Sequence, residues 1–401
     1  MSDAAPYMPM SVFLPPAGSS RAPPRAFIAP QRYVQGPCVL GEVGRYLAIT
    51  RLRHAAILMS ARGARGEGPA LEAGLRAAGI AATHCIFDGE ASLQEIERHA
   101  GALRGSGVDC LIALGGGKCV DAGKAIAHRI GVPAVIVPTL ASNDAPCSAL
   151  SVLYTPDGVY ADVEFYPLNP LFVIVDTEIV AAAPERFLVA GMGDAMATWY
   201  EARACRANPA SLNAAGAGQT IAACAIGEAC AHTLFEHGLA AASAVNSHRI
   251  DSHLEAVVEA NTLLSGLGFE SGGVAVAHGI AQSFTAVPAV HAHYLHGEEV
   301  AMGTLAQLML EGQPEDARRV ATFFAAVGLP IHLGQVSLAA SDHSAIDIVV
   351  DGTMAWPYTA NMPMAVTAPM IRDAILAADT LGRAVAGTAG DAAWRRLHGH
   401  A

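Results

Sequence analysis

The sequence predicts an α/β protein in two parts. A parallel sheet covered by helices is expected over residues 25–183, followed by an all-helical domain over residues 184–401. Three observations support this class. Short apolar runs alternate with helical patterns up to residue 183, which is typical of a parallel sheet buried on both faces. Long Ala-rich segments with helical spacing follow Pro184, without a strong strand pattern. The length of 401 residues is that of two domains.

The amino-terminal elements follow from the apolar pattern. Continuous aliphatic runs too short for helices predict strands at 55–59, 80–87, 108–114, 134–139 and 171–176. Apolar residues three and four apart predict the intervening helices at 71–79, 91–105 and 118–130. Residues 1–24 are rich in Pro, Met and Ser and show no period, so we expect a disordered or loosely docked arm.

The second domain shows only the helical period. Its expected helices cover residues 184–205, 211–236, 251–268, 298–311, 315–327 and 366–386. No internal repeat is evident.

Composition excludes several classes of protein. Twenty-four Lys and Arg residues face 36 Asp and Glu residues, and this net charge of −12 argues against a nucleic-acid-binding surface. A 52% share of hydrophobic residues excludes a largely disordered chain. No run of about 20 apolar residues predicts a membrane span, and the amino terminus lacks a signal-peptide pattern. Eight Cys residues without a CxxC motif agree with reduced thiols, so we expect a cytoplasmic protein.

A glycine-rich turn is the first candidate binding motif. In LGGGKCVDAGKA (114–125) a buried strand ends, three glycines follow, and a helix begins. The free N–H groups at a helix N-terminus suit a phosphate, and glycines allow its close approach. Neither of the usual phosphate-binding glycine patterns is present. An ordinary tight turn is therefore as well supported as phosphate binding.

The polar segment PTLASNDAPCSALSVLY (138–154) follows the strand at 134–139. It is expected at the carboxyl edge of the sheet, where α/β proteins bind ligands, and it contains one acid, Asp144. From the pattern alone, a surface loop in which Asp144 caps a turn is the favoured interpretation.

An acid and a group of histidines are the candidate metal ligands. Asp194 lies on an Ala-rich helix, where an acid usually complements the helix dipole. Four histidines are close in sequence: His278, His291, His293 and His296. An Asp and two His from separate helices would form the first shell of a divalent metal with an open position. A hydrogen-bonded core histidine is the more common role for a His in an apolar segment, and the spacing alone does not choose among the four.

Several long segments resemble the iron-containing (group III) alcohol dehydrogenase family, and within it the glycerol dehydrogenase branch. They occur in order over residues 25–390: RYVQG (32–36), GGGKCVDAGKAIA (115–127), GVPAVIVPTLASNDAPCSALSVLYT (131–155), VIVDTEIV (173–180), RFLVAGMGDAMATWYEARAC (186–205), EANTLLSGLGFESGG (259–273) and HGEEVAMGTLAQLMLE (296–311). Contiguous matches of this length are far more specific than a glycine pattern.

The resemblance implies a dehydroquinate synthase-like architecture, with a dinucleotide-binding α/β domain and a helical metal-binding domain. It assigns Asp194, His278 and His296 as metal ligands and Asp144 as the contact to the substrate hydroxyls. These four form the expected catalytic set. The positions expected to line the nicotinamide cofactor are Gly116, Gly117, Lys118, Asp121, Thr139, Ser142, Ser148, Leu150 and Tyr154, with Ser60 at the adenosine ribose.

The chain departs from the family pattern at four positions. Ser60, followed by Arg62 and Arg65, replaces an Asp that commonly holds the ribose hydroxyls, so NADP is expected to be tolerated beside NAD. Ala281 and Ala360 stand where the family often has His, at positions where the resemblance places the cleft. Glu299 stands where Lys is common, which we interpret as a change on a solvated face.

The resemblance implies a metal-dependent oxidoreductase and a homo-oligomer, from dimer to octamer. Hydride would pass from the secondary hydroxyl of a small polyol to NAD, with glycerol giving dihydroxyacetone, and Zn²⁺ is expected ahead of Fe²⁺. One alternative is an NAD(P)-dependent alcohol or 2-hydroxy-acid dehydrogenase of the same family. Another is a dehydroquinate synthase-like lyase, whose basic motifs for a phosphorylated substrate are missing here. A non-enzymatic protein of this fold would require loss of the metal ligands, and all three positions are filled.

Overall fold

The computed structural model describes residues 12–15, 19 and 21–399, which form two compact units. The first comprises Ala29–Ala141 and Ala145–Ala183, and the second comprises residues 184–399 with Ser142–Asp144 and the described residues before Ala29. The chain therefore passes from one unit to the other at Ala183–Pro184, and the segment 142–144 packs with the helical unit. The predicted arm at residues 1–24 lies largely outside the described residues.

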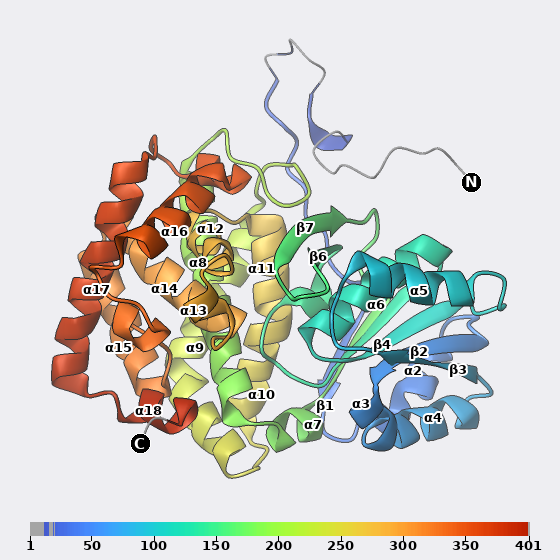
Figure 1. The fold of residues 1–401 in the computed structure, drawn as a ribbon. Helices are drawn as coiled ribbons and strands as arrows, with labels where there is room; N and C mark the ends of the chain where they lie inside the picture. The colour runs from blue at the N-terminus through green and yellow to red at the C-terminus, as the bar shows by residue number, and fades with distance from the viewer. Residues whose placement is uncertain (1–11, 16–18, 20, 400–401) are drawn as a thin grey trace. The chain divides into compact units, whose positions relative to one another are not determined.

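A six-stranded parallel sheet forms the centre of the first unit (Figure 1). Its spatial order is β1, β8, β5, β4, β2, β3, and residues such as Ile57 and Ile112 pair across neighbouring strands. The strands span Tyr33–Gly36 (β1), His54–Ser60 (β2), Ala81–Phe87 (β3), Cys110–Gly115 (β4), Ala134–Pro138 (β5) and Phe172–Asp176 (β8). The predicted fold class is thereby confirmed.

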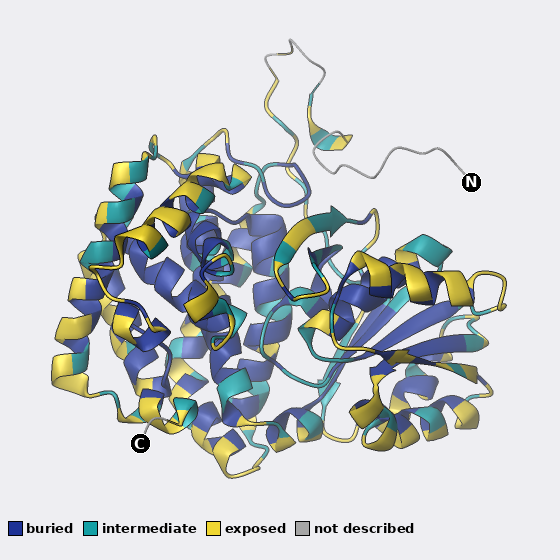
Figure 2. Cartoon of the chain, in the orientation of Figure 1, coloured by how far each residue is buried: buried dark blue, intermediate teal, exposed yellow. Residues whose placement is uncertain are grey.

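Helices cover both faces of this sheet, as a parallel sheet requires (Figure 1). On one face lie α5 (Leu93–Leu103) and α6 (Gly117–Ile130), and on the other lie α2 (Val43–Leu47), α3 (Ala61–Arg65) and α4 (Gly68–Ala77). Strands β2, β4, β5 and β8 are mainly dark blue in Figure 2 because aliphatic side chains on both faces are buried. The unit ends with α7 (Thr177–Ala182).

A β-hairpin begins within residues 138–154, a segment whose pattern predicted a loop. Strands β6 (Leu150–Tyr154) and β7 (Tyr160–Phe165) pair antiparallel, after a short 3-10 turn at Ala145–Cys147. The signal for this hairpin was present in Thr155-Pro156-Asp157-Gly158, whose glycine adopts a φ of 83°. The predicted loop at 138–154 is thus correct only before Leu150.

The second unit is helical, as predicted. Its helices span Glu185–Ala207 (α8), Ile221–Asn246 (α9), Ser252–Glu259 (α10), Ser265–Gly272 (α11), Val276–Phe284 (α12), Pro288–His291 (α13), His296–Leu310 (α14), Pro314–Val327 (α15), His343–Ala355 (α16), Ala368–Ala389 (α17) and Ala392–His398 (α18). A π-helical turn at Ala260–Leu264 joins α10 to α11, and short 3-10 turns occur at Leu333–Val336 and Pro357–Asn361. The first unit has a similar 3-10 turn at Leu40–Glu42.

The helix predicted at 211–236 starts and ends later in the chain than predicted, at Ile221 and Asn246. A loop occupies the residues before Ile221, because the Asn213 side chain accepts hydrogen bonds from the backbone of Ala215 and Ala217 and so closes a turn. The helix continues past residue 236 and includes Gly238 in its interior. A Cβ atom at Gly238 would approach the Phe323 ring to 2.7 Å, so this glycine serves close packing.

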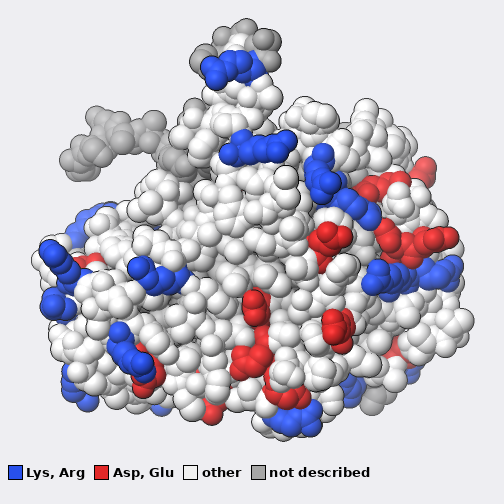
Figure 3. Space-filling model, turned by 180° about the vertical axis from the view of Figure 1, so that it is seen from behind, with Lys and Arg blue, Asp and Glu red and all other residues white. Residues whose placement is uncertain are grey.

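The end of the predicted arm pairs with the helical unit. The Gly218 N–H donates to the Pro24 carbonyl at 2.9 Å, and the Ala26 N–H donates to the Gly218 carbonyl at 3.2 Å. No helix in the described part of the chain is long and apolar enough to cross a membrane. Figure 3 shows Lys and Arg side chains dispersed among Asp and Glu side chains over one face. Absence of nucleic-acid binding stays a prediction.

Candidate functional site

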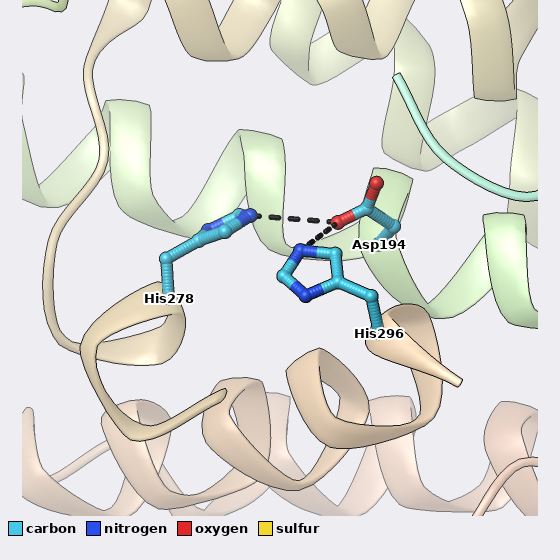
Figure 4. Close-up of side chains that lie close together, drawn as sticks. All are labelled: Asp194, His278 and His296. Carbon is cyan, nitrogen blue, oxygen red and sulfur yellow. Dashed lines mark ion pairs between the residues drawn. The ribbon is translucent and has the colours of Figure 1, made fainter. Parts of the chain in front are cut away.

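Three helices of the second unit bring Asp194, His278 and His296 together (Figure 4). Asp194 lies in the first half of α8, His278 is the third residue of α12, and His296 is the first residue of α14. One possible ligand atom from each side chain lies within 4.8 Å of the others. Asp194 Oδ1 is 3.4 Å from His278 Nε2 and 3.5 Å from His296 Nε2. Among the described residues, this is the group of acids, His and Cys that could hold a metal ion.

Two glycines allow α8 and α14 to approach closely enough for this arrangement. A Cβ atom at Gly193 would lie 2.2 Å from the Gly297 carbonyl oxygen, and one at Gly297 would lie 1.8 Å from the Ala190 carbonyl oxygen. Each glycine is the chain neighbour of a cluster residue, Asp194 or His296. Residues larger than glycine at positions 193 and 297 would push α8 and α14 apart and so separate Asp194 from His296. Close backbone packing therefore sets the geometry of the site.

Asp194 is buried and only half satisfied by the protein. Its side chain is 1% exposed, its Oδ2 accepts the Asp144 backbone N–H at 3.2 Å, and its Oδ1 accepts no hydrogen bond within the described structure. Burial alone would raise its pKa. The imidazoles of His278 and His296, whose Nε2 atoms lie 3.4 Å and 3.5 Å from Oδ1, together with the Asp144 N–H, outweigh burial and lower the pKa of Asp194 from its ordinary value of 3.8. The carboxylate is therefore ionised, with one buried oxygen available for a cation.

His278 lies between two carboxylates. Its Nε2 faces Asp194, and its Nδ1 donates to Glu201 Oε2 at 2.5 Å. Burial would lower the pKa of His278, but Glu201 and Asp194 raise it well above 6.5. For His296, burial is the largest influence and lowers the pKa. A cation bound at Nε2 of His278 would take the place of the proton held there.

The donor set fits a divalent metal ion. Two imidazole nitrogens and one carboxylate oxygen suit Zn²⁺ or Fe²⁺, and three protein ligands leave a position for a substrate oxygen. The buried Asp194 Oδ1 is the observation that supports this fit, because it accepts no hydrogen bond in the described structure and faces the Nε2 atoms of both imidazoles at 3.4 Å and 3.5 Å.

Two further carboxylates support the histidines, and sequence reasoning missed both. Glu201 contacts His278 from the same helix as Asp194, and its spacing of seven residues was the available signal. Glu298 accepts the Leu295 N–H at 2.8 Å, just before His296. Arg186 donates to both oxygens of Glu298 at 2.7 Å, and His398 Nε2 lies 2.9 Å from its Oε1, so α8 and α18 fix the start of α14.

Asp144 belongs to the same unit as this cluster and is buried. Its Oδ2 accepts a hydrogen bond from Ser265 Oγ at 2.7 Å, and Ser265 Oγ lies 2.8 Å from Thr198 Oγ1 on α8. Ser265 follows directly after the π-helical turn, a feature that is frequent at functional sites. The backbone of Asp144 thus contacts Asp194, and its carboxylate is held by a serine.

The residues expected to bind the cofactor gather mainly at one edge of the sheet. Strands β2, β4 and β5 are neighbours and parallel, so Ser60, the glycine turn and Thr139 all lie at their carboxyl ends. Helix α6 begins at Gly117 after Gly116, and Gly116 carries no side chain that could occupy its amino end. This edge has the arrangement that dinucleotides use in α/β proteins.

The remaining expected cofactor residues have structural partners. Lys118 forms an ion pair with Glu90 at 2.6 Å, and its Nζ lies 5.1 Å from the centre of the Tyr154 ring. Asp121 is buried and pairs with Lys124 at 3.0 Å. Lys124 also donates to Ser148 Oγ at 3.0 Å. Leu150 begins β6, and Ser142 belongs to the second unit. Their roles in cofactor binding stay predictions.

The other positions singled out in the sequence lie elsewhere. His291 ends α13, and His293 is exposed; neither joins the cluster of Asp194. Ala281 is fully buried against Ala197, Ala277 and Val300, so it packs in a core rather than lining a surface. Ala360 is exposed, and its carbonyl accepts from Asn208 at 3.0 Å.

The expectation that Glu299 lies on a solvated face is wrong. Its side chain is 3% exposed, and burial, followed by the neighbouring Glu298 charge, raises its pKa well above 4.5. The folded state therefore holds a proton on Glu299 at a pH where the unfolded chain, with a pKa of about 4.3, has lost it. As pH rises from the pKa of Glu299 in the unfolded chain towards its higher pKa in the folded protein, this group therefore lowers the free energy of unfolding.

We expect Glu299→Gln to raise the melting temperature more at pH 8 than at pH 5. Each pKa unit corresponds to about 1.4 kcal/mol, and each kcal/mol to roughly 2–4 °C for a unit of this size. Glu236→Gln, at a side chain that is 76% exposed, is the matched control and should show no such pH dependence. Equal changes at both pH values for Glu299→Gln would show that the carboxyl is not buried as described.

Known proteins resemble this chain over most of its length. Residues 30–177 match the family model described as iron-containing alcohol dehydrogenase. A glycerol dehydrogenase of Escherichia coli is 43% identical over 362 residues, 90% of this chain and 98% of the relative. A glycolaldehyde reductase of Halobacterium salinarum is 41% identical over 366 residues, with the same two coverages. The crystal structure of a glycerol dehydrogenase from Schizosaccharomyces pombe matches with a TM-score of 0.86 and 37% identity, over 91% of this chain and 93% of that chain.

Proposed function

This chain belongs to the iron-containing alcohol dehydrogenase family, and we propose that it oxidises glycerol to dihydroxyacetone with Zn²⁺ at Asp194, His278 and His296. It is an NAD-dependent oxidoreductase that acts on a CH–OH group of a polyol. Its cofactors are NAD and a divalent metal ion. The single observation that carries the proposal is the convergence of one buried carboxylate and two imidazoles from three helices.

The proposed ligands suit the activation of a hydroxyl group. A divalent ion would supply Lewis-acid chemistry, which lowers the pKa of a coordinated hydroxyl so that it loses its proton near neutral pH. Asp194 offers a buried anionic oxygen, and the two imidazoles add no charge, so the set leaves a cation with residual positive charge. By leaving this positive charge on a bound ion, the three ligands would favour an alkoxide over the neutral alcohol.

Asp144 would select for polyols. Its carboxylate is held by Ser265, and its backbone is joined to Asp194 by a hydrogen bond. A second hydroxyl of the substrate could donate to this carboxylate, whereas a simple alcohol has no such group. A substrate carboxylate would be repelled by Asp144, which disfavours the alternative of a 2-hydroxy-acid dehydrogenase.

The dinucleotide would bind at the carboxyl ends of β2, β4 and β5. There the open amino end of α6 suits the pyrophosphate, and Ser60 would lie at the adenosine ribose. The nicotinamide ring supplies the hydride chemistry. The similarity to glycerol dehydrogenases favours net reduction of the cofactor over a dehydroquinate synthase-like lyase, in which no net reduction of the cofactor occurs.

A substrate panel tests the proposal. Formation of NADH should be measured at 340 nm with glycerol, propane-1,2-diol, butane-2,3-diol and a 2-hydroxy acid, and its consumption with dihydroxyacetone and glycolaldehyde. We expect the vicinal diols and dihydroxyacetone to give the highest kcat/KM. A clear preference for glycolaldehyde would assign the reductive reaction of the second relative, and a preference for the 2-hydroxy acid would contradict the polyol assignment.

Ser60 provides a separate test of the cofactor site. It is exposed at the end of β2, where its Oγ accepts the Gly63 N–H at 3.1 Å and caps α3, and the nearby Arg62 side chain is 85% exposed. We expect measurable activity with NADP, and we expect Ser60→Asp to lower kcat/KM for NADP relative to NAD by about tenfold or more, or ~1.4 kcal/mol.

Asp and Asn both cap helices, so Ser60→Asn is the neutral control. Ser60→Asn should keep the ratio of kcat/KM for NADP to kcat/KM for NAD that the unmodified protein shows. If Ser60→Asp leaves the ratio unchanged, residue 60 does not face the ribose. The expected cytoplasmic location and the homo-oligomer stay predictions.

A further inference from the structure

We propose that Glu201 is a positioning residue of the metal site, which holds His278 with its Nε2 atom directed at the cation. This inference rests on the proposed metal-dependent function. Glu201 follows Asp194 by seven residues on α8, close to two full turns, so both carboxylates project from one face of the helix. The His278 ring lies between them, with Nδ1 at 2.5 Å from Glu201 Oε2 and Nε2 at 3.4 Å from Asp194 Oδ1.

The two oxygens of Glu201 have different partners. Oε1 accepts the backbone N–H of Ala275 at 2.8 Å and that of His278 at 3.0 Å. These N–H groups belong to the amino end of α12, for which the preceding residue, an alanine, offers no capping side chain. Oε2 is left for the imidazole. One fully buried side chain therefore fixes both the start of the helix and the orientation of the ring that the helix carries.

This arrangement determines which ring nitrogen can bind a metal. A carboxylate only accepts hydrogen bonds, so the Nδ1 facing Glu201 must carry a proton. The lone pair of the neutral ring then lies on Nε2, on the side of Asp194. Carboxylates paired in this way with metal-binding histidines fix the tautomer and increase the basicity of the ligand. Glu201 thus prepares His278 for the cation without itself contacting the site of binding.

Glu201→Gln separates the two tasks of Glu201, which are to hold the amino end of α12 and to set the tautomer of His278. The carbonyl oxygen of the new amide would accept the two backbone N–H groups, and its NH₂ group would then face Nδ1. Nδ1 would have to accept that hydrogen bond, which places the ring proton on Nε2, the atom needed for the metal. The volume of the side chain and the cap of α12 are kept, while the tautomer is reversed.

Gln307 provides a matched control on α14. Its Oε1 accepts the Ala277 N–H at 2.9 Å, so it also supports the amino end of α12, and its Nε2 donates to Tyr200 and Glu311 rather than to the His278 ring. Gln307→Leu removes support from this end of α12 but leaves the pair of Glu201 and His278 in place.

The experiment measures Zn²⁺ affinity by competition with a chromophoric chelator for the unmodified full-length protein, Glu201→Gln and Gln307→Leu. We expect Glu201→Gln to weaken Zn²⁺ binding by about 10–100-fold and Gln307→Leu to change it much less. The second measurement is the proton NMR spectrum of the Zn²⁺-loaded protein. The Nδ1–H of His278, which donates to a carboxylate, should give a strongly downfield resonance in the unmodified protein and in Gln307→Leu, and Glu201→Gln should lose this downfield shift because an amide NH₂ cannot accept from Nδ1.

Glu201→Asp gives the same test if Glu201→Gln does not fold, because it keeps the charge but withdraws the carboxylate from the ring. Its Zn²⁺ affinity should fall by about tenfold or more. Unchanged affinity in Glu201→Gln or in Glu201→Asp would overturn the proposal, as would an equal loss in Gln307→Leu. Failure of the unmodified protein to bind Zn²⁺ would instead contradict the metal-dependent function on which the inference rests.

Discussion

Replacement of His278 by Ala should abolish polyol oxidation and remove most of the bound metal. Two ligands would remain, Asp194 and His296, and the Lewis acid that stabilises the alkoxide would be lost. Several kcal/mol of transition-state stabilisation correspond to about a thousandfold or more in kcat. The fold should persist, because Glu201 keeps its hydrogen bonds to the backbone N–H groups of Ala275 and residue 278.

Metal content and kcat measured on the same preparation check this expectation. His293→Ala is the matched control, because His293 is exposed, lies outside the metal cluster, and makes its hydrogen bonds to Val290 and Arg186 through backbone atoms. It should retain both metal and activity. If His278→Ala kept its metal, or if His293→Ala lost it, the assigned set of ligands would be wrong.

The second large effect is expected at Asp144. Asp144→Asn keeps the shape of the side chain and an oxygen that can accept from Ser265, but it removes the negative charge. A charge-assisted hydrogen bond to a substrate hydroxyl contributes about 1.5–3 kcal/mol, or roughly tenfold to more than a hundredfold. The kcat/KM of the variant should fall by this factor for glycerol and vicinal diols. It should fall much less for propan-2-ol, which has no second hydroxyl.

Propan-2-ol serves as the internal control, and the melting temperature reports on structure. Asp144 is buried and bonded to Ser265, so a purely structural role would impair both classes of substrate together and lower the melting temperature. Equal losses on glycerol and propan-2-ol would contradict the polyol contact and favour a general alcohol dehydrogenase.

The sheet could be predicted because each central strand is a continuous aliphatic run. The runs at 55–59 and 108–114 became β2 and β4, which pair in parallel at the centre of the sheet. β1 and the second hairpin strand, β7, were missed because their residues are at most partly buried and include polar side chains. Strand pairing with distant residues, rather than local pattern, defines such elements.

The helical unit shows where local pattern is insufficient. Ala-rich sequence continues without a break from residue 214 to residue 246, so its period cannot locate the start of α9. The start depends on the side chain of Asn213, which closes a loop, and on Thr220, whose hydroxyl accepts the Ala223 N–H at 3.1 Å.

The site was predicted through the resemblance rather than through spacing. The structure places Asp194, His278 and His296 in one cluster, although the sequence alone did not choose among four histidines. Glu201 was missed because its partner His278 is 77 residues away, and the local signal, a spacing of seven residues from Asp194, is weak by itself. Glu299 was misplaced for the same reason, since a charged residue on a helix is usually exposed.

The most direct test of the account measures NADH formation from glycerol at 340 nm before and after removal of metal. The full-length protein should be treated with a chelator, freed of it, and then supplied with one equivalent of Zn²⁺. Activity should disappear on metal removal and return with Zn²⁺, and Zn²⁺ should not restore Asp194→Asn. Full glycerol oxidation by the metal-free protein, or restored activity in Asp194→Asn, would contradict the proposed function.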